Sequence, residues 1–328
     1  MFPVFILVSM TVLAISTVMT VFTNSFIIAV NLIDKCKGKN LSPSDFIVVT
    51  LCLSNILFQL IMLFNDYMSF LDGDIYFTDE VYIISTVMLI LPIYSSFWFT
   101  VCLSINYYLQ IVIATQPLLI KLKLASAQVI PHLILASLFI SLATGLPAAW
   151  NFSHDPQNVS VSSNQSVEIS VPSLNVVYLL PSTLISCSIP LILVGIANGL
   201  IIKTLVIHTH KSDRNSKGDL SARAEGRIRA ARTISCLLFL YISFYISEIL
   251  VFIEIFPQSS PGFCTCLMVM YSYSPAQSIV LIFGSPKLKQ VLLKVIHFIG
   301  GLKKQNRSAP TVLFINLRTK ETAILPDE

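Results

Sequence analysis

Long apolar runs separated by short polar segments make up most of the sequence. A helix needs about 20 mostly apolar residues to cross a bilayer. Seven runs reach that length: Phe2–Ile33, Phe46–Asn65, Val81–Ile120, Leu124–His154, Ile169–Ile202, Thr233–Ile253 and Ile255–Pro286. The pattern therefore predicts an all-α membrane protein, a seven-transmembrane helix bundle.

The hydrophobic pattern changes directly after the last run. Ser285 suits a helix N-cap, and Pro286 suits the first helical position. Apolar residues then recur at helical spacing with polar residues opposite, until Gly300 and Gly301 end the segment. The apolar positions are Leu288, Val291, Leu292, Val295 and Ile299. This pattern predicts a short cytoplasmic amphipathic helix on the membrane surface, with an ordinary solvated helix as the alternative.

Composition also points to a membrane protein. Of the 328 residues, 55% are hydrophobic and only 12% are charged, whereas a soluble domain has about 25% charged residues. No Gly/Ser-rich or Pro-rich linker divides the chain, and no internal repeat is visible. We therefore expect one seven-transmembrane domain over residues 1–300, including the juxtamembrane helix 285–300, and a short cytoplasmic tail over residues 301–328.

The cations are confined to alternate segments between the runs. All 21 Lys and Arg residues follow the first, third, fifth or seventh run, and the other segments carry acidic residues, among them Asp66. Lys and Arg near span ends are retained on the cytoplasmic side. The distribution predicts a multi-pass plasma membrane protein with an extracellular N-terminus and a cytoplasmic C-terminus. The net charge of +4 then reflects topology, so nucleic acid is not an expected partner.

Three glycosylation sequons test the same topology. Asn151, Asn158 and Asn164 each precede a Ser by two positions, all in the fourth loop, on the side predicted to be extracellular. A single sequon is common by chance, but three within 16 residues are not. We expect this loop to be glycosylated, least readily at Asn151, which lies closest to the membrane.

Four motifs occur in order along the helices. They read NSFIIAVNLID (Asn24–Asp34), SDFIVVTLCLSN (Ser44–Asn55), WFTVCLSINYYLQ (Trp98–Gln110) and SIVLIFGSPKLKQ (Ser278–Gln290). As an ordered set they resemble the type 2 taste receptors, the bitter taste receptor family of G-protein-coupled receptors. Asn55, Gln277 and Ser285 depart from that family's usual Arg, His and Asn. The Asp-Arg-Tyr and Asn-Pro-x-x-Tyr motifs of rhodopsin-like receptors are absent.

The resemblance implies a receptor that binds small organic, bitter agonists from the extracellular side. It also implies a heterotrimeric G protein as partner, gustducin-like or of the inhibitory class, beside the surrounding membrane lipid. The sequence has no Gly-rich phosphate loop and no metal-ligand cluster, so we expect neither an enzyme nor a cofactor or metal. It leaves open whether the chain forms homo- or hetero-oligomers.

Two other functions stay open as alternatives. A vomeronasal type 1 pheromone receptor is also a seven-helix receptor, but it should lack the Ser-Pro-Lys-Leu-Lys ending and the third-run motif. A channel or transporter belongs to another class. Transporters favour paired repeats and broken helices, and pores favour polar stripes. Neither pattern is visible in the sequence.

Glu248 directs attention to a candidate ligand site, because it is the one acidic residue that the pattern puts well inside a span. An intramembrane carboxylate pairs with a cationic ligand or with an internal donor. Aromatic and apolar residues with few polar anchors are typical of small-molecule pockets, although the same residues also serve as packing. The ligand-binding candidates are Leu89, Ile90, Ile93, Tyr94, Tyr241, Phe244, Tyr245, Glu248, Phe252, Leu267 and Met270.

Two further groups of polar residues complete the candidate sites. Polar side chains inside a bilayer need partners, so we expect a hydrogen-bonded activation network that joins the first, second and seventh helices. Its members are Asn24, Ser54, Asn55, Gln277 and Ser278, and simple adhesion between helices is the alternative. The candidate G-protein face comprises Tyr107, Tyr108, Gln110 and His208, at the cytoplasmic ends of the third and fifth helices.

Overall fold

The computed structural model describes residues 4–76, 78–111, 117–159, 170–212, 220–253, 255–257 and 260–298. The chain divides into two compact units, Met1–Gly284 and Ser285–Glu328. The first unit holds the helix bundle, and the described part of the second is a single helix. The sequence analysis grouped residues 285–300 with the bundle, and that grouping stays a prediction.

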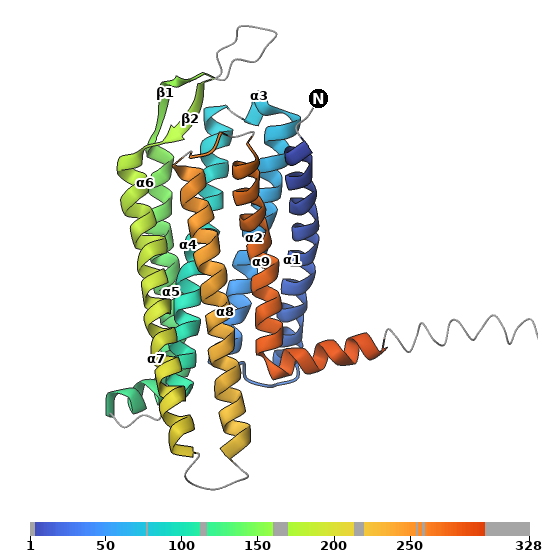
Figure 1. Ribbon diagram of the computed structural model, residues 1–328, viewed down its shortest axis with the longest axis vertical. Helices are drawn as coiled ribbons and strands as arrows, with labels where there is room; N and C mark the ends of the chain where they lie inside the picture. The colour runs from blue at the N-terminus through green and yellow to red at the C-terminus, as the bar shows by residue number, and fades with distance from the viewer. Residues whose placement is uncertain are drawn as a thin grey trace, which may run out of the picture. The chain divides into compact units, whose positions relative to one another are not determined.

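Seven helices of the described residues are long and apolar enough to cross a membrane, which confirms the predicted seven-helix architecture (Figure 1). One of the seven spans joins two helices through a five-residue π-helical turn, Leu184–Ser188. The bundle helices are α1 (Val4–Cys36), α2 (Pro43–Leu71), α4 (Asp79–Ile111), α5 (Pro117–Gly145), α6 (Val176–Thr183), α7 (Ile189–Ser212), α8 (Leu220–Phe252) and α9 (Pro261–Gly284).

The ends of α2 follow from local sequence signals. Ser42 caps its start, because the side-chain oxygen accepts a hydrogen bond from the Asp45 backbone N–H, and Pro43 occupies the first turn. The helix continues to Leu71, and the Asp72 backbone N–H closes it on the Met68 carbonyl. The expectation that Asp66 lies in a loop is therefore wrong. The polar pair at positions 65 and 66 does not end the helix, since apolar residues continue beyond it.

The fourth element, α4, forms the middle of the bundle. It packs against α2, α5 and α7, whereas the main packing partners of α1 are α2 and α9, at one edge of the bundle. Accordingly, 72% of the membrane-length window of α4 is buried, against 28% for α1. Side chains that point inward from α4 therefore meet most of the other helices, and this makes α4 the natural wall of an internal site.

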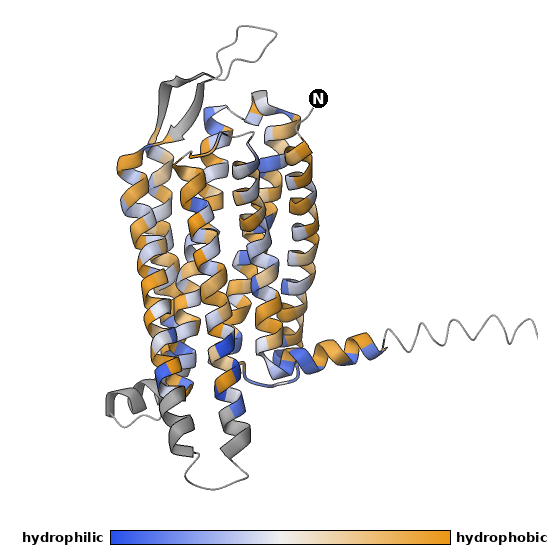
Figure 2. Cartoon of the chain, in the orientation of Figure 1, coloured by the Kyte–Doolittle hydropathy of each residue, from blue (hydrophilic) through white to orange (hydrophobic). Residues whose placement is uncertain are grey.

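The distribution of apolar and polar side chains between surface and interior is the reverse of that in a soluble protein. Large apolar side chains such as Phe22, Phe139 and Phe239 are about 70% exposed on the outer faces, while polar side chains such as Asn24, Gln59 and Ser274 are fully buried. Figure 2 shows apolar residues along much of the length of the bundle helices. This arrangement is stable only where lipid replaces water around the helices, and where internal polar groups find partners in the bundle.

A short antiparallel strand pair departs from the all-helical expectation. Strand β1 (Phe152–Val159) pairs with β2 (Ser170–Leu174), with Phe152 opposite Leu174. The pair follows a five-residue 3-10 turn, Leu146–Trp150, after α5. It lies at the same end of the bundle as the short helix α3 (Gly73–Tyr76) and the start of α1 (Figure 1). The pattern of the fourth loop did not reveal these strands because its polar residues alternate irregularly.

The second unit contains the amphipathic helix that the sequence predicts. The chain is helical from residue 286 to residue 298. At its start the Leu288 and Lys289 backbone N–H groups donate to the Ser285 hydroxyl and carbonyl, at 3.5 and 3.0 Å. The expected end, at Gly300, lies outside the described residues.

Candidate functional site

An aromatic cluster occupies the centre of the bundle, where α2, α4, α8 and α9 meet. The Phe97 ring stacks on the Tyr241 ring with centroids 4.0 Å apart and planes 16° from parallel. Phe244 contacts Phe97, Phe58 and Tyr273 at centroid distances of 5.6, 5.9 and 4.8 Å. Edge and stacked contacts of this kind add to the stabilisation from burial alone. Four helices are thus held together by one set of rings.

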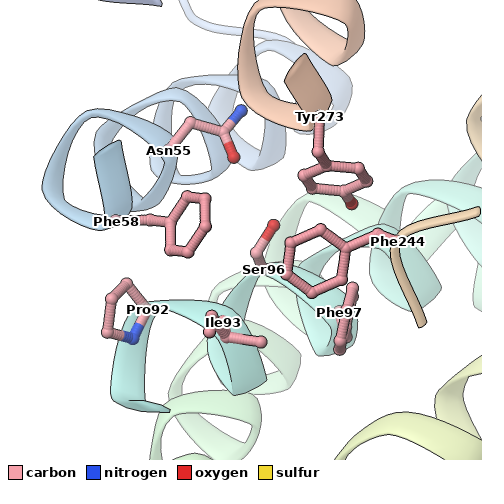
Figure 3. Close-up of a pocket in the computed structure, with 8 residues that line it drawn as sticks. All are labelled: Asn55, Phe58, Pro92, Ile93, Ser96, Phe97, Phe244 and Tyr273. Carbon is pink, nitrogen blue, oxygen red and sulfur yellow. The ribbon is translucent and has the colours of Figure 1, made fainter. Parts of the chain in front are cut away.

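A small cavity lies inside this cluster, as Figure 3 shows. Its volume is about 10 Å³, which is room for about one water molecule. The Ser96 hydroxyl points into the space between the Phe58 and Tyr273 rings, is buried, and has no hydrogen-bond partner. The wall is formed by Asn55, Phe58, Pro92, Ile93, Ser96, Phe97, Phe244 and Tyr273.

Of the ligand-binding candidates, Ile93 and Phe244 line the cavity. Ile90, Tyr94, Tyr241 and Met270 belong, with these two, to the larger hydrophobic core that contains the rings. Leu89, Tyr245 and Leu267 pack on the core from outside. Phe252 does not join them, because its side chain is 37% exposed at the end of α8. The sequence analysis did not single out Phe58, Phe97 or Tyr273, since nothing in the hydrophobic pattern separates these rings from ordinary packing residues.

Glu248 lies beside the aromatic cluster, facing the π-helical turn between α6 and α7. Its side chain is 2% exposed, and its Oε2 atom accepts a hydrogen bond from the Cys187 thiol at 3.8 Å. The Tyr241 hydroxyl donates to the Cys187 carbonyl at 2.6 Å. One helical turn away, the Ser188 and Tyr245 hydroxyls are 2.5 Å apart. Three polar contacts therefore tie α8 to this turn.

Proline explains why the helix widens at this point. Pro190 has no N–H to donate to the Ser186 carbonyl four residues back, and its ring crowds that carbonyl. The ladder adjusts by one residue, so that the Ile189 N–H bonds to the Leu184 carbonyl. Single π-turns inside α-helices are frequently found at functional sites. Here the widened turn is the segment that receives the side chains of α8.

A second intramembrane acid lies between α2 and α9. The Tyr271 hydroxyl donates to the Asp66 Oδ2 atom at 2.5 Å. The sequence analysis missed this pair because it ended the second span one residue before Asp66. The signal was available, since Tyr67, Met68, Phe70 and Leu71 continue the apolar pattern up to the Asp72-Gly73 stop.

Asn24, Asn55 and Gln277 meet in a buried polar network next to the cavity. The Asn55 Nδ2 atom donates to the Gln277 Oε1 atom at 2.7 Å and to the Asn24 Oδ1 atom at 3.4 Å. The Gln277 Nε2 atom donates to the Tyr273 hydroxyl at 3.1 Å. The network therefore joins α1, α2 and α9 and ends on a ring of the cavity wall.

The remaining two members of the expected network lie apart from these amides. The Ser278 and Thr23 hydroxyls are 2.6 Å apart, so Ser278 links α9 to α1 directly. Ser54 faces α4 instead, where its hydroxyl donates to the Pro92 carbonyl at 2.8 Å and lies 3.1 Å from the Ser95 hydroxyl. The carbonyl that loses its helical donor at Pro92 is that of Met88, four residues earlier, so the Ser54 bond to the Pro92 carbonyl is an additional contact between α2 and α4.

The candidate G-protein residues lie at the opposite end of the bundle from the strands. Tyr107 and Tyr108 are partly buried near the end of α4. The Gln110 Nε2 and Asn106 Nδ2 atoms both donate to the Ser44 hydroxyl, at 3.0 and 2.7 Å, which ties this end to α2. His208 is part of α7, but its side chain lies outside what the structure describes.

The sequons fall partly within the described chain. The Asn151 side chain donates to the Pro147 carbonyl at 2.7 Å and is half-buried at the end of the 3-10 turn. Asn158 lies in strand β1, and Asn164 lies outside the described residues. Within the described residues, no group of three or more His, Cys, Asp or Glu side chains could hold a metal ion.

Sequence comparisons identify relatives over almost the whole chain. The family model of taste receptor protein (TAS2R) matches residues 1–299. The chain is 29% identical to taste receptor type 2 member 40 of Gallus gallus over 282 residues, which cover 85% of the chain and 90% of that relative. It is 27% identical to taste receptor type 2 member 9 of Macaca mulatta, covering 88% and 92%. Taste receptor type 2 member 39 of Macaca mulatta is also 27% identical, covering 92% and 90%.

Proposed function

The chain belongs to the taste receptor protein (TAS2R) family, and we propose that it is a bitter taste receptor that binds small organic agonists within its helices and activates a heterotrimeric G protein. The observation that carries the proposal is the aromatic cluster around an internal cavity in a bundle of seven membrane-length helices. A family of this kind acts through a partner's chemistry, so the receptor itself needs no catalytic group.

The proposed orientation follows from the cations. The N-terminus, α3 and the strand pair lie at one end of the bundle, and the segments at that end carry no Lys or Arg (Figure 1). Positive residues are retained in the cytoplasm. The strand end is then extracellular and faces incoming agonists, while the ends of α4 and α7 that carry Tyr107, Gln110 and His208 face the G protein.

The agonist site is proposed at the cavity among α2, α4, α8 and α9. A ligand pocket usually has a volume of roughly 300–1,000 Å³, whereas this cavity has about 10 Å³. The rings that close it are held by stacking and by single hydrogen bonds, so they separate at modest cost. An agonist therefore binds an opened arrangement of the rings better than the closed one and shifts the population toward it.

Tyr241 connects ring movement to helix movement. Its ring stacks on Phe97 in the cavity wall, and its hydroxyl holds the Cys187 carbonyl of the π-helical turn. Displacing the ring by an agonist breaks this hydrogen bond and loosens α8 from α7. Small shifts of packed helices become larger rearrangements at the far end of a bundle, which is where the G protein would dock.

Glu248 is proposed to recognise cationic agonists. Its carboxyl group is buried beside the cluster, and it accepts a hydrogen bond from the Cys187 thiol, which is a weak donor. A ligand ammonium group is a stronger partner than a thiol. The acid is thus available to a charged ligand once the rings open.

A calcium assay in cells with a promiscuous G protein, run against a panel of bitter compounds, tests the function. We expect at least one compound to evoke receptor-dependent calcium release without ionic current through the receptor. Current that follows the ligand without G-protein signalling would support the channel alternative. Silence across a broad panel, with the receptor at the cell surface, would contradict the proposal.

A pair of serine variants tests the site. Ser96→Val places an extra methyl group at the cavity and removes its free hydroxyl, so we expect agonist potency to fall. Ser104→Val is the matched control, because Ser104 is a buried serine of the same helix that does not line the cavity. Equal effects of the two variants at equal surface expression would contradict the cavity as the agonist site.

A further inference from the structure

A second hollow lies on the outer face of the bundle, between α8 and α9. Its volume is about 290 Å³, close to the lower end of the range of ligand pockets, roughly 300–1,000 Å³. Neighbouring side chains on the same stretch of α8, Phe239 and Ile246, are 70% and 52% exposed. A face of this kind in a membrane-length helix meets lipid, so the groove opens to the bilayer.

The chemistry of the groove selects uncharged molecules. Its lining contains no Asp, Glu, Lys, Arg or His. Ser243, Thr265 and Ser272 contribute hydroxyls that donate to carbonyls of their own helices, at 3.0, 2.7 and 2.7 Å. Each of these oxygens keeps a lone pair free to accept a hydrogen bond. A small apolar ligand with one hydroxyl donor satisfies both the apolar wall and these acceptors.

Tyr273 separates this groove from the central cavity and lines both. On the inner side its ring packs on Phe244 at 4.8 Å. Its hydroxyl accepts from Gln277, which joins the ring to the polar network of α1, α2 and α9. Its side chain is only 5% exposed, so a ligand in the groove that moves this ring changes the cavity wall and the network together.

From this geometry we infer that the groove between α8 and α9 is a membrane-facing binding site for uncharged lipophilic alcohols or phenols, coupled to the central cavity through Tyr273. The inference rests on the proposed receptor function only for its signalling consequence. Binding itself is measurable on the protein without any agonist.

Photolabelling of the full-length receptor in lipid nanodiscs tests the site. The probe is trifluoromethyl-diazirinyl benzyl alcohol, an uncharged photoreactive aromatic alcohol, and the competitor is trifluoromethylbenzyl alcohol. We expect saturable labelling of the α9 segment Thr265–Ala276, displaced by the alcohol but not by trifluoromethylbenzoate. Labelling that does not saturate, or that cholesterol displaces while the alcohol does not, would overturn the inference.

Matched variants separate the groove from the lipid-facing surface in general. Ala276→Phe fills the groove, so we expect the probe's apparent affinity to fall roughly tenfold or more, since the ring takes the volume that a ligand needs. Ala136→Phe adds the same ring to an exposed position of α5, and labelling of α9 should stay unchanged. Equal labelling in wild type and Ala276→Phe would refute the site while leaving the receptor function intact.

Tyr273→Leu tests the coupling. It keeps an apolar side chain but removes the ring and its bond to Gln277. We expect the alcohol to shift the potency of a cavity agonist in wild type and to lose that effect in Tyr273→Leu, with α9 still labelled. A potency shift that survives in Tyr273→Leu would overturn the role of Tyr273. Failure of every agonist in wild type would count against the receptor function and not against the groove.

Discussion

Breaking the amide pair between α2 and α9 gives the sharpest quantitative test of the polar network. Asn55 and Gln277 are each 1% exposed, and the Asn55 Nδ2 atom donates to the Gln277 Oε1 atom at 2.7 Å. Asn55→Ala removes this bond and the longer one to Asn24. A buried acceptor left without its donor costs about 1–3 kcal/mol. Hydrogen bonds between membrane helices average about 0.6 kcal/mol and reach about 1.7 kcal/mol. We therefore expect Asn55→Ala to lower the free energy of unfolding by an amount in the lower half of the range of about 1–3 kcal/mol.

A double-mutant cycle isolates the pair from the cavity that Asn55→Ala also enlarges. The free energy of unfolding is measured by denaturant titration in lipid bicelles for Asn55→Ala, Gln277→Ala and the double variant. We expect a coupling energy of about 0.6–1.7 kcal/mol. The control cycle pairs Asn55→Ala with Ser235→Ala, which breaks the 3.1 Å hydrogen bond from the Ser235 hydroxyl to the Asn198 Oδ1 atom between α8 and α7. The control should be additive within about 0.5 kcal/mol.

The same variants decide whether the network is part of activation. If the amides hold the unliganded arrangement, weakening them favours the signalling arrangement. A loss of about 1 kcal/mol shifts such an equilibrium roughly fivefold, so basal G-protein signalling should rise by up to that factor. Coupling in the Asn55–Gln277 cycle no larger than in the control would refute the network itself. Coupling with unchanged basal signalling would leave the amides a purely structural role.

Three further outcomes follow from the structure. Glu248→Gln should lower the potency of cationic agonists by about tenfold or more, as expected for the loss of a buried charge pair, and leave the potency of neutral agonists unchanged. An equal change for both kinds of agonist in the calcium assay would contradict ligand recognition by this acid. Tyr271→Phe leaves the buried Asp66 carboxyl without the hydroxyl that donates to it, and should cost about 1–3 kcal/mol of unfolding free energy; retained stability would show that water replaces the hydroxyl. Glycosidase treatment should increase the gel mobility of the wild-type receptor. If Asn151 is unused, the same treatment should leave the mobility of the Asn158→Gln, Asn164→Gln double variant unchanged. A wild-type receptor that carries no glycan in mammalian cells would count against the proposed topology.

The helix count could be predicted from sequence because it depends on one property, the length of apolar runs. Helix ends depend on finer signals. The second run stops at Asn65 on a hydropathy count, but the helix continues to Leu71 because the next turn is again apolar and Asp72-Gly73 supplies the stop. The Asp66–Tyr271 pair was lost for this reason.

Contacts between helices were predictable only where polarity left few choices. Asn24, Asn55 and Gln277 are amides in apolar surroundings, so pairing among them was expected, and the structure brings them together. Ser54 was expected in the same network, but its hydroxyl bonds to the Pro92 carbonyl instead, because that contact depends on how α2 is rotated against α4. The π-helical turn and the closed ring cluster depend on Pro190 and on side-chain rotamers, which no single-sequence pattern specifies.

The most direct test of the central claim is nucleotide exchange on a purified heterotrimeric G protein of the inhibitory class, mixed with the purified receptor in lipid nanodiscs. An agonist found in the calcium screen should accelerate exchange with wild-type receptor and with Ser104→Val, and its potency should fall with Ser96→Val. Exchange that no agonist accelerates, or that both serine variants affect equally, would contradict a receptor that opens this cavity to signal.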